Sequence, residues 1–204
     1  MSPTTAAALI IGNEILSGKI ADKNLSVLAR TLRGLGIELA RAVTIRDEMD
    51  VIVEEVRALS RAHAWLFTSG GVGPTHDDLT IEAVARAFDA PVEVEPELEA
   101  LIRGAYGDAL RDGHLLMARI PRGARLVRND HVPWPAVLMR NVWVLPGVPE
   151  IFERKMTLLE SVVSKAPPFV SLVVVSGLDE GNLKPYLDRV VEGYPDVDVG
   201  SYPQ

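Results

Sequence analysis

The stretch Thr68-Ser69-Gly70-Gly71-Val72-Gly73-Pro74-Thr75-His76-Asp77-Asp78-Leu79-Thr80 decides how the rest of the chain is interpreted. It follows a short apolar run, Ala64–Thr68, and leads into an amphipathic segment over 78–88, so we predict a buried strand, a glycine turn and a helix. Glycine lets the backbone approach a ligand, and free N–H groups at a helix start attract an anion. The stretch lacks the Lys-Ser/Thr pair of a Walker loop and the spacing of a dinucleotide fingerprint.

Adjacent aspartates close this stretch and allow two interpretations. Thr75, Asp77 and Asp78 are suitable caps for the following helix, where they would also oppose its dipole. One cap is enough, however. A second carboxylate beside a phosphate site favours a divalent cation held by oxygen ligands.

Two other predicted strands are also followed by glycine-containing loops. The first strand, Ala6–Ile11, is followed by Gly12-Asn13-Glu14-Ile15-Leu16-Ser17-Gly18, and a later strand, Val142–Leu145, by Pro146-Gly147-Val148-Pro149-Glu150. Open α/β sheets bind ligands at the carboxyl ends of their strands, so we expect these loops to share one crevice with Gly70–Gly73.

Simpler interpretations of these loop residues stay open. Glu14 is equally a solvent-facing carboxylate, and Pro149 is also suited to a plain helix start. Asp47 follows the strand Ile37–Ile45, where it or Asp50 could cap the next helix.

The whole chain alternates short apolar runs with amphipathic stretches, which is typical of an α/β domain. We predict a main domain over 1–165 and a small α/β extension over 166–204, which is too short for a core of its own. The extension is expected to have a strand over 169–175, a helix over 181–191 and another strand from Val197, and we expect the natural chain to continue beyond Gln204. In the main domain we predict further helices around 25–35, 52–59, 96–111 and 149–163, with a long loop and short hairpin strands over 120–137.

Composition limits the classes of function. The 204 residues are 48% hydrophobic and 24% charged, which fits a globular protein. Cysteine is absent, so a disulfide scaffold, a thiolate metal site and a cysteine nucleophile are excluded. The net charge of −7 argues against nucleic-acid binding. No signal peptide or membrane span is recognisable, so we expect a cytoplasmic protein without a membrane partner.

The glycine-rich stretch 69–80, together with 12–18 and 145–149, resembles the N-terminal domain of the CinA family, in the MoaB/Mog molybdopterin-binding superfamily. Order and spacing match over roughly residues 5–165. This resemblance implies a three-layer α/β/α sandwich with a mostly parallel sheet, as in MogA and MoaB. It also implies a homodimer or homotrimer.

The resemblance further implies a site. Its phosphate-binding residues would be Gly12, Glu14, Ser69, Gly70, Gly71, Gly73, Pro74, Thr75, Asp77, Pro146, Gly147 and Pro149. Asp78 and, by a looser alignment, Asp47 match the two acidic positions of molybdopterin-processing relatives, which makes them the expected catalytic residues. With Glu14 they are the expected ligands of a divalent metal such as Mg, Mn or Co, and no organic cofactor is expected.

Three functions remain open. The first is a metal-dependent pyrophosphatase acting on a nucleotide such as ADP-ribose or FAD; the second is binding or adenylylation of molybdopterin; the third is a binding module without catalysis. In each, the partner is a phosphorylated nucleotide or pterin. The segment His131–Ala136 departs from the family pattern, which leaves substrate identity open, and the amidase domain of full-length CinA is absent.

Outside these motifs, His76 and Trp134 have both functional and structural interpretations. His76 could contact a phosphate or a metal, or be an exposed loop residue. Trp134 could stack on a flat ring, although packing of its loop onto the body is favoured. His63, His114 and His131 show no paired spacing and are interpreted as structural.

Overall fold

The computed structural model describes residues 4–163, 167 and 169–202. The chain divides into two units, Met1–Phe169 and Val170–Gln204. None of the helices in the described part is long and apolar enough to cross a membrane.

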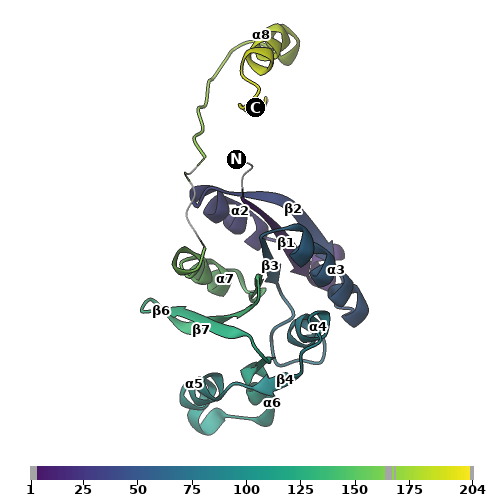
Figure 1. Cartoon of the computed structure of the whole chain (residues 1–204), viewed down its shortest axis with the longest axis vertical. Helices are drawn as coiled ribbons and strands as arrows, with labels where there is room; N and C mark the ends of the chain where they lie inside the picture. Colours follow the sequence, from purple (N-terminus) through teal and green to yellow (C-terminus); the bar gives the residue numbers. More distant parts are fainter. Residues whose placement is uncertain (1–3, 164–166, 168, 203–204) are drawn as a thin grey trace. The chain divides into compact units, whose positions relative to one another are not determined.

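The first unit is built on a mixed sheet in which the neighbouring strands β2, β1, β3 and β8 pair in parallel, whereas β7 pairs antiparallel with both β8 and β6 (Figure 1). In spatial order the strands are β2 (Ile37–Ile45), β1 (Thr4–Ile11), β3 (Trp65–Ser69), β8 (Val142–Val144), β7 (Val132–Met139) and β6 (Arg125–Asn129). The mostly parallel sheet expected from the family resemblance is confirmed.

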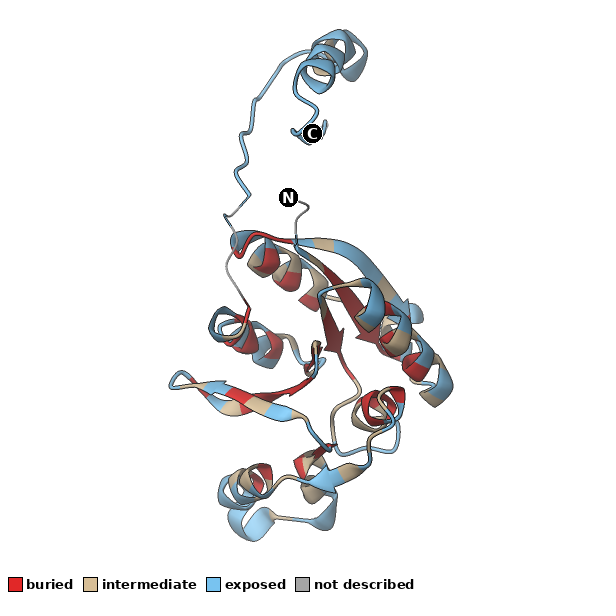
Figure 2. Cartoon of the chain, in the orientation of Figure 1, coloured by how far each residue is buried: buried red, intermediate tan, exposed pale blue. Residues whose placement is uncertain are grey.

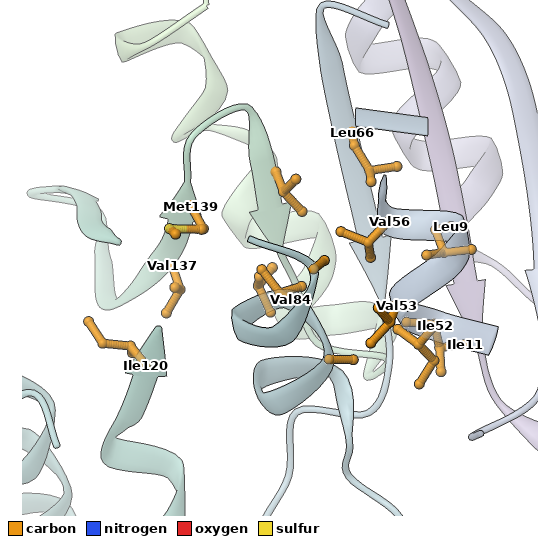
Figure 3. Packing of buried hydrophobic residues seen from close by; sticks show 14 of the residues in the cluster. Leu9, Ile11, Ile52, Val53, Val56, Leu66, Val84, Ile120, Val137 and Met139 are labelled. Atoms are coloured by element: carbon orange, nitrogen blue, oxygen red, sulfur yellow. The ribbon is translucent and has the colours of Figure 1, made fainter. Parts of the chain in front are cut away.

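Helices cover both faces of this sheet because β1 is apolar on both sides. Figure 2 shows β1 buried along most of its length. Leu9 and Ile11 pack with the helices α3 (Met49–Ala62) and α4 (Thr80–Ala87), as Figure 3 shows for α3. The alternate residues Ala8 and Ile10 pack with α2 (Asn24–Gly34) and α7 (Pro149–Met156) on the other face. Successive strand side chains point to opposite faces, so a run of apolar residues produces three layers.

Several short elements complete the first unit. One turn of helix, α1 (Asn13–Leu16), follows β1, and a 3-10 turn, η3 (Leu159–Ser161), follows α7. Between α4 and β6 the chain forms a two-stranded antiparallel sheet with helical turns beside it. These are β4 (Val92–Val94), α5 (Pro96–Tyr106), η1 (Gly107–Ala109), α6 (Asp112–Leu115), η2 (Leu116–Ala118) and β5 (Arg119–Pro121).

The hairpin strands predicted over 120–137 are confirmed, since β6 and β7 form an antiparallel pair there. The long loop is wrong, because the proline-containing strand β7 also joins the main sheet through β8. β7 pairs with β6 and with β8, and the β6–β7 register shifts between Val127 and Asn129. Pro133 and Pro135 lie opposite this irregularity. Proline has no N–H group, and it is tolerated here because the regular hydrogen bonding between β6 and β7 is already interrupted. Local proline content predicted a loop, whereas the bulge makes a strand possible.

Two predicted helices are shorter than expected. The helix over 96–111 ends at Tyr106, because Gly107 has a φ of 48° and turns the chain. The helix over 149–163 ends at Met156, and the chain then turns so that the neighbouring residues Leu158 and Leu159 are both fully buried. Beyond Leu158 lies the 3-10 turn Leu159–Ser161, where the N–H groups of Ser161 and Val162 donate to the carbonyls three residues earlier.

Among the described residues of the second unit, the predicted helix forms and the predicted strands do not. The helix α8 (Glu180–Gly193) is confirmed, with Asp179 capping it through a bond from the Asn182 N–H. The described residues of 169–175 and 197–202 have no strand, so both strand predictions are wrong. Val170 and Val175 are each 93% exposed, which means that this apolar run has no sheet to pair with.

Candidate functional site

A cleft of about 1110 Å³ opens at the carboxyl ends of β1, β3 and β8, which is large enough for a nucleotide-sized ligand. Gly70 and Gly147 line it from neighbouring loops. The Gly70 N–H donates to the Leu145 carbonyl at 3.2 Å, and a Cβ on Gly147 would lie only 3.3 Å from the Gly70 Cα. The two glycine loops therefore touch, and only glycine permits this approach without displacement.

The carboxylate of Asp78 holds the glycine-rich loop in shape. Its Oδ1 accepts a hydrogen bond from the Gly73 N–H at 2.6 Å, and its Oδ2 accepts from the N–H and the hydroxyl of Thr75 at 2.8 and 2.6 Å. The helix α4 begins at Thr80, after Leu79, with no side-chain cap. Thr75, Asp77 and Asp78 therefore do not cap α4. The carboxylate of Asp78 instead accepts hydrogen bonds from within the glycine-rich loop.

The start of α4 stabilises the same loop through two hydrogen bonds. The buried Thr80 hydroxyl donates to the Gly70 carbonyl at 2.8 Å, and its N–H donates to the Gly71 carbonyl at 2.9 Å. Gly70 and Gly71 have φ values of 105° and 65°, and side chains there would collide with the Ile11 carbonyl oxygen and the Thr80 hydroxyl. Both positions require glycine.

Four backbone donors at the edge of this cleft are unused. Within the part of the chain that the structure describes, the N–H groups of Gly71, Val72, Gly147 and Val148 donate to no protein acceptor. All four residues line the cleft. Free N–H groups close to a helix start form a site that favours an anion.

The three carboxylates expected to hold a metal do not converge. Glu14 and Asp78 line the cleft, whereas Asp47 is outside its lining and its Oδ2 accepts from the Asn13 N–H at 2.8 Å. Among the described residues, no three histidine or acidic side chains lie close enough to hold a metal ion by themselves. Asp47 does not cap the helix α3 either, since the residue before that helix is Glu48 and no side-chain cap forms.

The other expected phosphate-binding residues divide into two sets. Gly70, Gly71, Gly73, Thr75, Pro146, Gly147 and Pro149 line the cleft together with Glu14 and Asp78. Gly12, Ser69, Pro74 and Asp77 do not line it. Asp77 accepts from the Thr75 hydroxyl, and this hydrogen bond lowers the pKa of its exposed carboxyl.

Asn24 joins the two loops and was missed by the sequence analysis. It is buried at the start of α2, and its Nδ2 donates to Ser69 Oγ at 2.8 Å and to the Gly147 carbonyl at 2.9 Å. Its Oδ1 is buried and accepts no hydrogen bond from the described residues. The signal available in the sequence was an asparagine beside Asp22 and Lys23, which does not identify a partner 123 residues away.

Basic side chains in the cleft wall were also missed. Lys23, Arg119, Arg154 and Lys155 line the cleft, and Arg119 pairs with Glu82 at 2.7 Å. Lys155 is only 4% exposed, and burial lowers the pKa of its ammonium group to about 8. A lysine at the end of an amphipathic helix gives no sequence signal of burial, because lysine is usually exposed.

Trp134 and His76 both line the cleft but differ in burial. Trp134 is half-buried and packs against the core, so both of its sequence interpretations remain compatible with its position. The His76 side chain is 98% exposed and lies 4.0 Å from the Asp77 carboxylate. Of the remaining histidines, His63 contacts the Thr5 hydroxyl at 3.2 Å and His114 stacks on Tyr106.

The fold and the paired glycine loops define a class of α/β proteins with an anion site at the ends of parallel strands. Residues 7–165 match the family described as "Probable molybdopterin binding domain". The chain belongs to this family.

Individual relatives agree with this assignment. A solved structure of the protein CinA with unknown function from Thermoplasma acidophilum has a TM-score of 0.71 and 29% identity, and the match covers 78% of this chain and 97% of that one. MoaB from Pyrococcus furiosus, a tungsten cofactor synthesizing protein, has a TM-score of 0.53 at 19% identity over 80% of this chain and 94% of its own, and supports the fold alone.

Two relatives by sequence are longer than the chain. A protein of Archaeoglobus fulgidus is 34% identical over 95% of this chain and 83% of its own length. A protein of Caenorhabditis elegans named "Probable FAD synthase" is 30% identical over 98% of this chain, which spans only 44% of that protein.

Proposed function

We propose that the cleft binds a phosphorylated pterin or nucleotide, with its phosphates against the two glycine loops. The observation that carries this proposal is the group of unused N–H donors at Gly71, Val72, Gly147 and Val148, on loops that touch each other. Family membership and the volume of the cleft support the same class of ligand. The half-buried face of Trp134 is available to the flat ring of such a ligand.

The reaction we propose is hydrolysis of a nucleotide pyrophosphate such as ADP-ribose or FAD. Water attacks one phosphorus, the bridging P–O bond breaks, and AMP leaves together with the second phosphorylated product. The free N–H groups of the loops would stabilise the charge that develops on the phosphate oxygens. Asp78 would act by keeping those N–H groups in place as well as through its own charge.

A divalent ion fits this cleft only with the help of the substrate. Of the three predicted ligands, Glu14 and Asp78 line the cleft, and an ion that also binds phosphate oxygens needs only one or two carboxylates from the protein. When bound there, the ion would neutralise part of the phosphate charge. Asp47 would position the start of α1 through Asn13 instead of binding the ion.

The test is release of AMP from ADP-ribose, FAD and ATP, each with and without Mg²⁺, Mn²⁺ or Co²⁺. We expect AMP from ADP-ribose or FAD only when metal is present. If no substrate yields AMP but calorimetry detects nucleotide binding, the hydrolase proposal fails and a binding module remains.

Adenylylation of molybdopterin is the second candidate, because the family is described by molybdopterin binding and one relative carries the name of a FAD synthase. It requires ATP and a pterin phosphate together. Transfer of labelled AMP from ATP to the pterin, without hydrolysis of ADP-ribose, would favour it over the pyrophosphatase.

Self-association and a cytoplasmic location complete the proposal. A homodimer or homotrimer is expected from the family resemblance stated above. Sedimentation at micromolar concentration tests it, and a monomer alone would contradict it.

A further inference from the structure

Lys155 is a buried cation without an acidic partner. Its Nζ donates to the carbonyl oxygens of Trp134 and Pro135, at 3.0 and 2.5 Å, and no ion pair of Lys155 is present among the described residues. An ammonium group has three donors, so these two bonds leave one N–H unused. Burial of a charge is costly unless an opposite charge compensates it.

The position of this ammonium group relates it to the Pro-Gly loop. Val137 of β7 pairs with Val144, the last residue of β8, and β8 leads directly into the Pro-Gly loop. Pro135, whose carbonyl oxygen Lys155 contacts, precedes Val137 by two residues in β7. Lys155, Pro135, Pro146 and Gly147 all line the same cleft.

We infer that Lys155 is the cationic binding group for the ligand's phosphate at the Pro-Gly end of the cleft. The phosphate supplies the opposite charge that the buried ammonium group lacks and accepts its third N–H. The free N–H groups of Gly147 and Val148 bind the same anion. This inference rests on the proposed function, because it requires a ligand with a phosphate.

A purely structural role for Lys155 makes a different prediction. The two carbonyl contacts would then matter only for the shape of β7, around Pro133 and Pro135. Loss of the side chain would weaken charged and neutral ligands alike, because both use the same cleft wall.

The test compares inorganic pyrophosphate, AMP and adenosine in calorimetric titrations. The variant Lys155→Met keeps an unbranched side chain of similar length and removes the charge. It should weaken pyrophosphate and AMP by about tenfold or more and adenosine by less than about twofold, since a charged hydrogen-bonded contact acts only on the anion. Lys184→Met is the matched control, because Lys184 is exposed on α8, pairs with Asp188 and does not line the cleft.

The outcomes separate the two proposals. If the unsubstituted protein prefers AMP to adenosine and Lys155→Met retains that preference, the role of Lys155 is overturned and the proposed function stands. If the unsubstituted protein binds none of the three probes, both fail.

A measurement on the unsubstituted protein covers the case in which Lys155→Met does not fold. The Cε resonance of Lys155 should shift on addition of pyrophosphate and stay unchanged with adenosine. An unchanged resonance in saturating pyrophosphate would overturn the inference.

Discussion

The two walls of the cleft differ in charge. The wall formed by the glycine-rich loop carries the carboxylate of Asp78, whereas the wall formed by the Pro-Gly loop and α7 carries the cations of Arg154 and Lys155. Both walls also present free backbone N–H groups. The difference suggests a division of roles, in which the acidic wall accommodates a cation and the basic wall binds the phosphate directly.

The walls also differ in how they are held. The glycine-rich loop is fastened by its own residues, since Asp78 binds Gly73 and Thr75 within five positions. The Pro-Gly loop depends on distant residues, because Asn24 binds the Gly147 carbonyl across 123 positions. Substitutions in the first wall should act locally, and substitutions in the second should act through the body of the fold.

Asp78→Asn should have the largest effect on activity. Asparagine has a single acceptor oxygen, so its NH₂ group would face the N–H of Gly73 or Thr75 and open the loop. We expect turnover to fall by about a hundredfold, or about 3 kcal/mol of transition-state stabilisation. AMP release over a metal titration measures it, with Asp77→Asn as the control, because Asp77 accepts only from the Thr75 hydroxyl and lies outside the cleft lining.

The metal titration distinguishes two causes of that loss. Activity that recovers at high metal concentration identifies Asp78 as a ligand of the ion. If activity does not recover and residues 70–78 are cleaved faster by a protease, the carboxylate acts by stabilising the conformation of the loop. Unchanged activity would remove Asp78 from the site.

Lys155 should make stability depend on pH in a defined direction. Burial lowers the pKa of its ammonium group from 10.5 to about 8, so below pH 8 both the folded and the unfolded chain carry the proton and the full burial cost applies. Between pH 8 and 10.5 the folded protein loses the proton first, so its free energy of unfolding rises with pH. The rise should approach about 3 kcal/mol, since each pKa unit is worth about 1.4 kcal/mol.

Other groups titrate in the same range, so the comparison is made against Lys155→Met. Denaturant unfolding of both proteins is measured from pH 7.5 to 10.5. The unsubstituted protein should gain stability relative to the variant across this window. A constant difference between the two would show that the Lys155 ammonium group keeps its ordinary pKa.

The sequence predicted the glycine-rich wall better than the basic wall, because the first is encoded locally. An apolar strand, glycines and a helix start lie within 13 consecutive residues, 68–80, and the structure brings this loop to the Pro-Gly loop as expected. Asn24 and Lys155 were missed because their partners lie far along the chain, at Ser69 and Gly147 and at Trp134 and Pro135.

The errors in the predicted fold have the same origin. Pro133 and Pro135 indicated a long loop with short hairpin strands, but pairing of β7 with β8 and a bulge opposite β6 make this segment an eight-residue strand of the main sheet. The apolar run from Phe169 to Val175 indicated a strand, but a strand requires a partner that the sequence does not identify. The pattern of apolar residues shows which segments can be buried, whereas the pairing of a strand with its neighbours depends on the tertiary structure.

Asn24→Ala should weaken the connection between the two walls. The substitution removes the donors to Ser69 Oγ and to the Gly147 carbonyl, and should lower the free energy of unfolding by about 2 kcal/mol. Asn141→Ala is the matched control, because the Asn141 Nδ2 also makes two hydrogen bonds, to the carbonyls of Ser60 and His63, outside the cleft lining. Both variants should lose stability in chemical denaturation, but only Asn24→Ala should also weaken AMP binding. Equal AMP affinity in the two variants would show that Asn24 stabilises the fold without positioning the loops.

Alanine substitutions at Gly73 and Gly147 give the sharpest test of the difference between the walls, and the smallest expected effect is that of Gly147→Ala. At Gly73 a Cβ would lie 2.7 Å from Asp78 Oδ2, and that carboxylate is fixed by three hydrogen bonds, so Gly73→Ala should reproduce part of the Asp78→Asn defect. At Gly147 the Cβ would lie 3.3 Å from the Gly70 Cα, which a shift of a few tenths of an ångström relieves.

Gly147→Ala should therefore change stability by less than about 1 kcal/mol and weaken AMP binding by only about threefold, through displacement of the free N–H groups of Gly147 and Val148. Thermal unfolding and calorimetry on the two variants measure this, with Gly177→Ala as the control, because a Cβ there meets nothing within 4 Å. If the glycine-rich wall is stabilised by its own residues and the Pro-Gly wall by residues distant in sequence, Gly73→Ala should weaken AMP binding more than Gly147→Ala does. Greater loss of AMP affinity in Gly147→Ala would reverse that order and show that the contact between Gly147 and Gly70, not the Asp78 fastening, sets the geometry of the anion site.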